Sequence, residues 1–378
     1  MKRTICILIA GVVFLFYSGC DEEGNPADSS SERVSGASYA VVTTRSIVET
    51  GETEAGAVSL ISLDDLSPHR GRLKSINSDN QARAYPEGVF ILEREDDNII
   101  YSNDADVSSG GISQESFGSG VNIQDIVPVS DTMSCVVCLK SEYLYFYDYT
   151  AGVKKDSVDL SDYSHEGEDV PYLADVEYSN GTVYVMIQRL VTVQSDKGAY
   201  QSTGDSTSLV VGVDTETRSV VSEVSLNYKN ANKMALKNGF LYIGSPGDWG
   251  SYDGGIERID VSSFESSEIV LEESDVEGDV SNFAFVSQSK GYVALAGYDS
   301  EGSFYTHLYP ADLSAGTIGE RITEVKYAFG GLAYSSGKLF AGDRSESGSG
   351  VYVIDTDTDS VVTGPVDVGF APNDISVY

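Results

Sequence analysis

Histidine and tryptophan are scarce in this sequence, which has three histidines and one tryptophan among 378 residues. His69, His165 and His307 lie in unrelated segments, so we expect no shared acid–base or metal-binding cluster of imidazoles. The G-x-S-x-G turn of serine hydrolases and the zinc motif H-E-x-x-H do not occur. These absences give catalysis little support, and the sequence favours a chain that is not an enzyme.

Cysteine is also rare, with four residues in the chain. Cys135 and Cys138 form a C-x-x-C pair, but Leu139 stands where haem attachment requires histidine, and no second Cys/His cluster could complete a zinc site. The segment is β-branched and strand-like, whereas redox-active pairs begin a helix. Residues three apart along a strand are separated by about 10 Å, too far for an undistorted disulfide. We therefore predict two thiols packed in the core.

Basic residues are few, because 24 lysines and arginines stand against 59 aspartates and glutamates and the formal net charge is -35. Such a surface repels phosphate backbones and anionic lipid head groups, so we expect no nucleic acid partner. The acidic excess can attract cations or basic partners, and it also keeps an exported protein soluble.

Long hydrophobic runs are limited to one near the N-terminus, from Ile5 to Tyr17, which is shorter than the roughly twenty residues of a membrane-spanning helix. Lys2 and Arg3 precede this run, and Ser18-Gly19-Cys20 follows it. A basic start, a short apolar run and small residues are typical of a secretion signal.

The Ser18-Gly19-Cys20 end of this run resembles the lipobox of bacterial lipoproteins, although Tyr17 stands where an aliphatic residue is usual. The resemblance implies a signal peptide over residues 1–19, cleavage before Cys20, and a lipid on that cysteine. The polar residues 20–36 would then form a flexible tether. The chain would belong to the bacterial cell envelope, periplasmic or surface-exposed, touching the membrane through its lipid anchor alone. The alternative is an ordinary secreted protein with an incidental Cys20.

After this segment no helical periodicity is evident, and the chain repeats itself about every fifty residues. A small apolar strand, a turn and a second strand recur as ARAYPEGVFILER, DVEYSNGTVYVMIQ, KMALKNGFLYIGS and GLAYSSGKLFAGD, with two further copies. The predicted second strands begin near the following positions: Gly88, Met133, Gly181, Gly239, Gly291 and Gly337.

A third and a fourth strand, joined by a turn that begins with aspartate, follow most copies of this motif, as in VYVIDTDTDSVV. The alternating acids after Asp355 look like a calcium loop, but Ser360 and Val366 stand where an EF-hand needs glycine and glutamate. An aspartate that opens a tight turn accepts hydrogen bonds from nearby backbone N–H groups. We expect this role at four aligned positions, Asp148, Asp214, Asp260 and Asp355.

Four short strands per repeat are typical of a propeller blade. Six copies of the first motif are complete, and a seventh is divided between SYAVVTT near residue 38 and APNDISVY at the C-terminus. The predicted fold is therefore an all-β, seven-bladed β-propeller over residues 37–378, closed by N- and C-terminal strands that share one blade. Segments such as VYVIDTDTDSVV and PVDVGFAPNDISVY resemble the YVTN-type, WD40-like repeat of bacterial surface-layer and periplasmic proteins. The likeness is at the level of fold, and such folds host lactonases, quinone enzymes and binding scaffolds.

Long insertions are predicted on one face of this propeller, and they include residues 190–208 and 245–255. Trp249 lies in the second insertion with Tyr252 and Asp253. An exposed aromatic residue beside aspartate suits a sugar ring or a protein surface, so these three residues are the predicted ligand-binding site. The alternative is that Trp249 folds back to cover a blade edge.

Polar residues open the inner strands of five blades, at Asp125, Asp175, Asn232, Asn282 and Asp374. We expect a polar ring at the mouth of the central channel. Asp125, Asp175 and Asp374 could hold Ca²⁺ or another divalent cation through oxygen ligands. The favoured alternative is that each side chain bonds the backbone of its own turn.

These patterns predict a lipid-anchored, monomeric propeller that acts as a non-catalytic binding or assembly scaffold for a protein or a glycan of the cell envelope. The alternative is a lactonase-like propeller hydrolase with a divalent metal over the channel. A third hypothesis is that the chain is a structural component of a surface layer.

Overall fold

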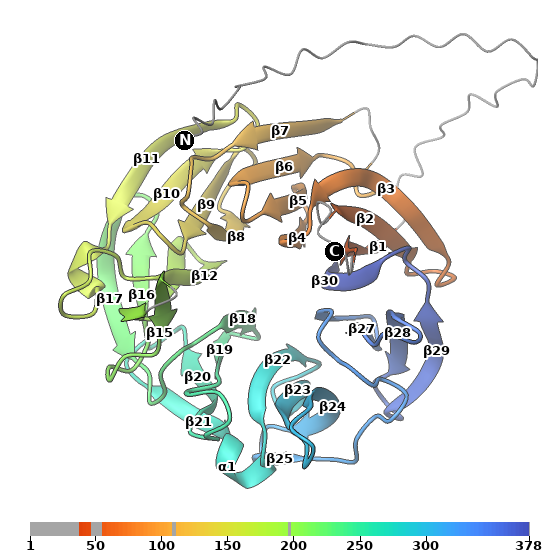
Figure 1. Ribbon diagram of the computed structural model, residues 1–378. Helices are drawn as coiled ribbons and strands as arrows, with labels where there is room; N and C mark the ends of the chain where they lie inside the picture. The colour runs from red at the N-terminus through yellow and green to blue at the C-terminus, as the bar shows by residue number, and fades with distance from the viewer. Residues whose placement is uncertain (1–37, 47–54, 108–110, 196–197, 378) are drawn as a thin grey trace, which may run out of the picture. The chain divides into compact units, whose positions relative to one another are not determined.

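The computed structural model describes residues 38–46, 55–107, 111–195 and 198–377. The predicted signal peptide, Cys20 and the predicted tether lie outside the described residues. Within the described part of the chain, no helix combines the length and apolarity that a membrane crossing would require. Seven four-stranded antiparallel sheets follow one another around a ring (Figure 1). The predicted all-β, seven-bladed β-propeller is confirmed.

The blades are numbered along the chain, and their strands are given from the centre of the ring outward. Blade 1 consists of β30 (Ala371–Val377), β1 (Tyr39–Arg45), β2 (Ala55–Ser62) and β3 (Pro68–Asn77). Blade 2 consists of β4 (Asn80–Tyr85), β5 (Gly88–Glu93), β6 (Asn98–Ser102) and β7 (Ile112–Ser116). Blade 3 consists of β8 (Ile123–Pro128), β9 (Met133–Cys138), β10 (Tyr143–Asp148) and β11 (Val153–Asp159).

Blade 4 consists of β12 (Leu173–Ser179), β13 (Thr182–Ile187), β16 (Leu209–Asp214) and β17 (Ser219–Ser225). Blade 5 consists of β18 (Lys233–Lys237), β19 (Phe240–Ser245), β20 (Gly255–Asp260) and β21 (Ser267–Glu272). Blade 6 consists of β22 (Asp279–Phe285), β23 (Lys290–Tyr298), β24 (Phe304–Asp312) and β25 (Thr317–Ile318). Blade 7 consists of β26 (Leu332–Ser335), β27 (Lys338–Asp343), β28 (Gly350–Asp355) and β29 (Ser360–Val366).

Three short elements interrupt this pattern. A hairpin of β14 (Val191–Ser195) and β15 (Gly198–Ser202) is inserted between β13 and β16. The 3₁₀ turn η1 (Ser161–Tyr163) and the helix α1 (Glu273–Val276) lie in links between blades. The second strands of blades 2 to 7 begin within one residue of the predicted positions.

Blade 1 closes the ring because its strands come from both ends of the described chain. β1 pairs antiparallel with β2 on one side and with β30 on the other, where Val42 lies opposite Ile375. Ile375 is buried together with Phe340 and Val353 of blade 7. The predicted sharing of one blade by the terminal strands is confirmed.

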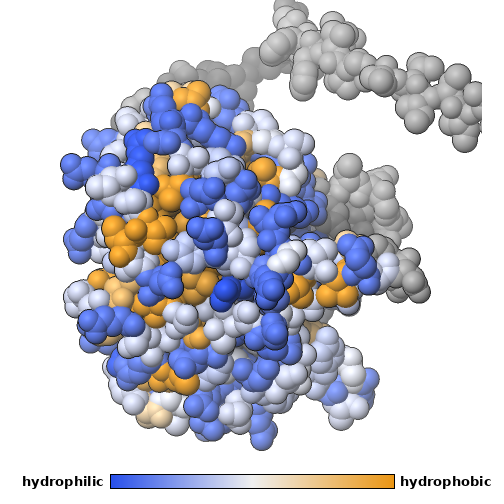
Figure 2. Space-filling view, turned by 90° about the vertical axis from the view of Figure 1, so that its left-hand side faces the viewer, coloured by the Kyte–Doolittle hydropathy of each residue, from blue (hydrophilic) through white to orange (hydrophobic). Residues whose placement is uncertain are grey.

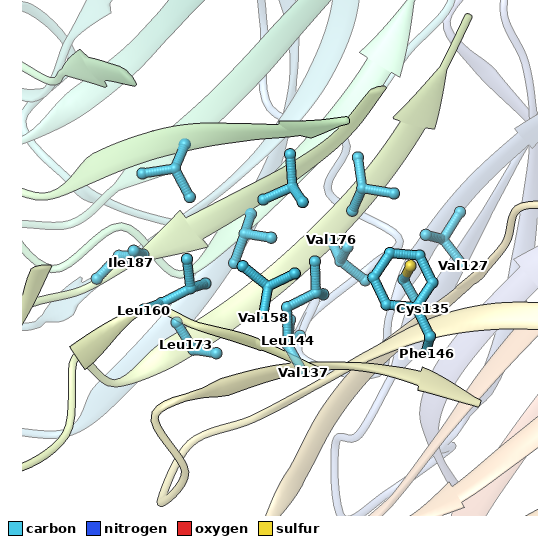
Figure 3. Close-up of a cluster of buried hydrophobic side chains, with 14 of the residues drawn as sticks. Val127, Cys135, Val137, Leu144, Phe146, Val158, Leu160, Leu173, Val176 and Ile187 are labelled. Atoms are coloured by element: carbon cyan, nitrogen blue, oxygen red, sulfur yellow. The ribbon is translucent and has the colours of Figure 1, made fainter. Parts of the chain in front are cut away.

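Clusters of buried hydrophobic side chains fill the seven junctions between neighbouring blades. Alternation along a strand sends successive side chains to opposite junctions. In β9, Cys135 packs toward blade 4, in the cluster that Figure 3 shows, whereas Cys138 packs toward blade 2. Both are buried free thiols, and burial raises the pKa of each. The predicted core-packed thiols are confirmed.

Aspartates open the outer turns of several blades, as predicted. Asp355 Oδ1 accepts the backbone N–H groups of Asp357 and Thr358, each at 3.0 Å. The Thr358 hydroxyl donates to the same oxygen, and these hydrogen bonds lower the pKa of Asp355. The aligned carboxylates of the other blades accept backbone N–H groups in the same way, at Asp148, Asp214 and Asp260. Asp355 is therefore a turn residue.

The rim at blades 3 and 4 mixes hydrophilic and hydrophobic residues. Figure 2 shows this side, where hydrophobic residues form separate patches among hydrophilic ones. The outer strand β11 is exposed along most of its length and carries Lys154, Lys155 and Asp156. An outer strand has an unpaired edge, and charged side chains oppose its pairing with another sheet. This composition suits an edge that faces solvent.

Candidate functional site

The longer loops of the propeller gather on one face, as predicted. Because neighbouring strands are antiparallel, the link from the second to the third strand and the link to the next blade lie on the same face. Residues 246–254 of blade 5 and 319–331 between blades 6 and 7 are two such links, and the hairpin β14–β15 is a third. We call this side the loop face.

Trp249 lies on the loop face beside a pocket of about 340 Å³. The residue is 48% exposed. Asn230, Gly247 and Asp248 of blade 5 and its incoming link form one part of the lining. The other part comes from blade 4 and comprises Leu190, Gln201, Ser202 and Thr203. The hairpin, which supplies Gln201 and Ser202, was not predicted from the sequence.

Tyr252 and Asp253, which were predicted to act with Trp249, are not in the lining of this pocket. Tyr252 has a φ of 54°, in the left-handed region, and its side chain interacts with Tyr305 of blade 6. Asp253 Oδ1 accepts the backbone N–H of Asp248 at 2.8 Å and so braces the loop. The structure brings Trp249 together with Asp248 and the blade 4 hairpin instead.

A second aromatic group on the loop face lies between blades 6 and 7, and we call it the aromatic cluster. It consists of Tyr298 and Phe304 at the ends of β23 and β24, and of Tyr327 and Phe329 in the link to blade 7. Neighbouring ring centroids are 5.4 to 6.2 Å apart. The Arg344 guanidinium lies 5.3 Å from the centroid of Phe329. Tyr298 is 60% exposed and Phe329 is 39% exposed.

A polar cavity of about 410 Å³ lies in the central channel, lined by residues from the inner strands of all seven blades. Arg83 of β4 reaches across it in two directions. Its Nε lies 2.5 Å from Asp125 Oδ1 of blade 3, and its Nη1 lies 2.9 Å from Asp374 Oδ2 of blade 1. Two of the three predicted cation ligands thus already share an arginine.

The same acids also hydrogen-bond to the inner strand of the neighbouring blade. Asp374 Oδ2 accepts the N–H of Ala82 at 3.3 Å, and Asp125 Oδ2 accepts that of Val176 at 3.2 Å. Asp175 Oδ2 accepts the N–H of Met234 at 2.7 Å. The expectation that each side chain bonds the backbone of its own turn holds for Asp175, whose Oδ1 accepts the adjacent N–H of Val176 at 2.8 Å, and it is wrong for Asp125 and Asp374. An inner strand has a free edge of backbone N–H groups, and the nearest acceptor belongs to the next blade.

Lys233 extends this pattern to blade 6, where its Nζ donates to Asn282 Oδ1 at 2.6 Å and to the carbonyl of Phe283 at 3.0 Å. Contacts of this kind therefore connect blades 1 to 6 around the channel. We call the participating side chains the polar belt, and they are Arg83, Asp125, Asp175, Lys233, Asn282 and Asp374. Asn232, predicted as a member, lies beside Lys233 in the lining of the cavity.

Burial shifts the titration of several groups in the channel. It raises the pKa of Asp175, with a further contribution from the Asp125 carboxylate, and it raises the pKa of Glu177 from 4.5 to about 7. Burial lowers the pKa of Lys233. Folded Glu177 thus binds its proton more tightly than the unfolded residue does. Its contribution to the free energy of unfolding is therefore lost as the pH rises from about 4.5 through about 7.

The remaining chemistry-bearing residues do not converge. In the described residues, no group of three or more His, Cys, Asp or Glu side chains is placed to hold a metal ion. His69 packs edge-on against Tyr39 in blade 1, and His307 stacks on Tyr305 in blade 6. His165 Nε2 lies 2.7 Å from Asp205 Oδ1 near the blade 4 hairpin. The geometry gives the predicted divalent-cation site no support.

No protein-family model and no curated protein sequence matches the chain. Solved structures match its fold. A chain of hydrazine synthase from Kuenenia stuttgartiensis has a TM-score of 0.58 at 12% identity, over 79% of this chain and 88% of that chain. Apo AztD from Citrobacter koseri has a TM-score of 0.55 at 12% identity, over 90% and 98%. The computationally designed Ika8 protein has a TM-score of 0.52 at 11% identity, over 88% and 90%. At these identities the likeness concerns the propeller fold alone.

Proposed function

We propose that this chain is a lipid-anchored propeller of the bacterial cell envelope that holds a partner protein on its loop face without catalysis. The observation that carries the proposal is the aromatic cluster, in which Tyr298 and Phe329 expose much of their surface. Exposed aromatic side chains leave apolar area in contact with water, which is unfavourable unless a partner covers it.

The composition of the cluster favours a protein partner. Tyrosine, phenylalanine and arginine are enriched at the centres of protein interfaces, where a few such residues supply most of the binding energy. Arg344 lies against Phe329, so one contact offers both an apolar surface and a cation. The net charge of -35 favours a partner with a basic rim, because opposite charges steer association.

The channel gives a further reason to propose binding without catalysis. Asp125 and Asp374, the acids that a hydrolase would use around a metal, are paired with Arg83. Asp125 and Asp175 also accept backbone hydrogen bonds between blades. These contacts are those of residues that hold the ring together.

The lipid anchor is tested at Cys20. Cells that express the wild type in the presence of an alkyne-labelled fatty acid should incorporate the label into the protein, and the protein should sediment with membranes. The Cys20→Ser variant should lose the label, because it lacks the thiol that carries the lipid. A variant that still incorporates the label would contradict the anchor at Cys20.

The partner site is tested by photo-crosslinking in living cells. A benzophenone amino acid at Tyr298 should crosslink the chain to one envelope protein, and Phe329→Ser in the same chain should reduce that product at least tenfold. The matched control places the benzophenone at Val221, which is 58% exposed on the outer strand β17. Equal crosslinking from both positions, or none from Tyr298, would rule out the aromatic cluster as the docking site.

A further inference from the structure

We infer that the pocket beside Trp249 binds the ring of a neutral saccharide, at a site separate from the aromatic cluster. Its volume of about 340 Å³ lies at the lower end of the range of small-molecule sites, about 300 to 1,000 Å³. Two blades form it, since Thr203 follows the blade 4 hairpin and Trp249 lies in the blade 5 loop. A ligand there contacts two independent loops that rest on rigid sheets.

The Trp249 indole supplies a flat apolar platform for the C–H face of a pyranose ring. The loop that carries it is held in place before any ligand arrives. The backbone N–H of Gly250 donates to Asp279 Oδ2 at 2.8 Å, and that of Asp248 donates to Asp253 Oδ1. A platform that is already ordered loses little conformational freedom on binding. An indole suits this position because it combines an apolar ring with one N–H donor.

The edge of the pocket matches the hydroxyl groups of a sugar. Gln201, Ser202 and Thr203 lie on one side, and Asn230 lies on the other. Side-chain amides and hydroxyls both donate and accept hydrogen bonds, as sugar hydroxyls do. Asn230 Nδ2 already donates to the carbonyl of Gly247 at 3.0 Å, which fixes the orientation of the amide.

The charge of the pocket favours a neutral ligand. Asp248 is the carboxylate of the lining, and its Oδ2 lies 2.5 Å from Lys229 Nζ. The Thr203 hydroxyl donates to the other oxygen of Asp248. The attraction for a cation is therefore largely satisfied within the protein, while the net charge of -35 disfavours anionic sugars.

Because Trp249 is the sole tryptophan of the chain, its fluorescence reports directly on this pocket. The full-length protein is titrated with three neutral disaccharides, cellobiose, maltose and N,N′-diacetylchitobiose, up to about 10 mM, and the same titrations are followed by calorimetry. We expect a saturable change in fluorescence, together with heat of binding, for at least one of them, with a Kd in the millimolar range or tighter.

Variants separate this site from the proposed docking site. By calorimetry, Trp249→Ala should weaken saccharide binding about tenfold or more, whereas Trp249→Phe should retain most of it, because a ring remains. The Tyr298→Ser/Phe329→Ser double variant should bind the saccharide normally, so failure of one proposal leaves the other intact. The inference is overturned if no disaccharide binds, or if Trp249→Ala binds as tightly as the wild type.

Discussion

A chain that lacks residues 375–378 should lose about 5 kcal/mol or more of its free energy of unfolding, an amount comparable to the whole stability of many domains. Ile375 is buried against blade 7, and loss of such a side chain costs about 2 to 5 kcal/mol. The truncation also removes backbone hydrogen bonds between β1 and β30, which pair through Val377, Ser376 and Ile375. Each lost hydrogen bond costs about 1 kcal/mol. The Ala84 N–H also loses its acceptor, Ser376 Oγ.

The measurement is urea unfolding followed by circular dichroism, combined with amide hydrogen exchange. In a closed ring the damage should reach distant blades, so the amides of β13 in blade 4 should exchange faster in the truncated chain. A control variant, Val362→Ser on the outer strand β29, removes an exposed side chain and should change the free energy of unfolding by less than about 0.5 kcal/mol. If the truncated chain unfolded at the same urea concentration as the wild type, the pairing of β30 with β1 would contribute nothing to the free energy of unfolding.

The blade pattern could be predicted because it depends on residues that are close in sequence. Alternating apolar positions define a strand, and Gly or Asp at a turn defines where it ends, as at Gly88 and Asp355. The same strand and turn pattern recurs about every fifty residues, so one blade predicts the others. Closure of the ring could be predicted by counting strands, because the N-terminal unit lacks a first strand and the C-terminal unit lacks a second.

Contacts across the channel could not be predicted in the same way. Alternation shows that Arg83 and Asp125 face the centre, but the distance between two inner strands depends on the radius of the whole ring. Acids and amides supply the oxygen ligands of a cation site, so the predicted ring did not include Arg83, which lines the channel in blade 2. A balance of acidic against basic residues in the inner strands would have identified this cation.

The face that carries the long loops was predicted correctly, but the residues predicted to act together there do not line one pocket. Trp249 is exposed there, as an aromatic residue in a long loop suggests. Tyr252 has a φ of 54°, and its side chain interacts with Tyr305 of blade 6 and does not line the pocket beside Trp249. Such a conformation is rare outside glycine, so spacing in the sequence gives no sign of it. The aromatic cluster brings together rings from β23, β24 and the link to blade 7. The sequence alone does not show that these rings are in contact.

Arg83→Met should be the most damaging single substitution in the channel, with a loss of about 3 to 5 kcal/mol in the free energy of unfolding. Methionine keeps the unbranched stem of the side chain but removes the guanidinium, whose charge faces both Asp125 and Asp374. The Asp125 side chain is 3% exposed, so little of its carboxylate is hydrated in the folded protein. The loss mainly reflects the cost of leaving a buried carboxylate without its cation.

Arg72→Met is the matched control, because the same change breaks an ion pair at the surface. Arg72 Nη2 lies 3.0 Å from Asp106 Oδ2, and both side chains are at least one third exposed. Water solvates these groups when the pair is broken, so the loss should stay below about 1 kcal/mol. Equal losses in the two variants would mean that the channel pair contributes no more than a surface pair.

The pH dependence distinguishes lost charge from lost packing in Arg83→Met. The charge of Arg83 opposes the upward pKa shifts of Asp175 and Glu177 that burial produces, so its removal should raise both further. The folded variant then holds protons to a higher pH than the unfolded chain, and its free energy of unfolding falls more steeply as pH rises. The difference in free energy of unfolding between wild type and Arg83→Met should therefore be larger at pH 8 than at pH 5. A difference that is the same at both pH values would indicate lost packing, since a cavity does not titrate.

Asp125→Asn in the Arg83→Met background should recover part of the lost free energy of unfolding at pH 8, because it removes the carboxylate that the arginine had neutralised.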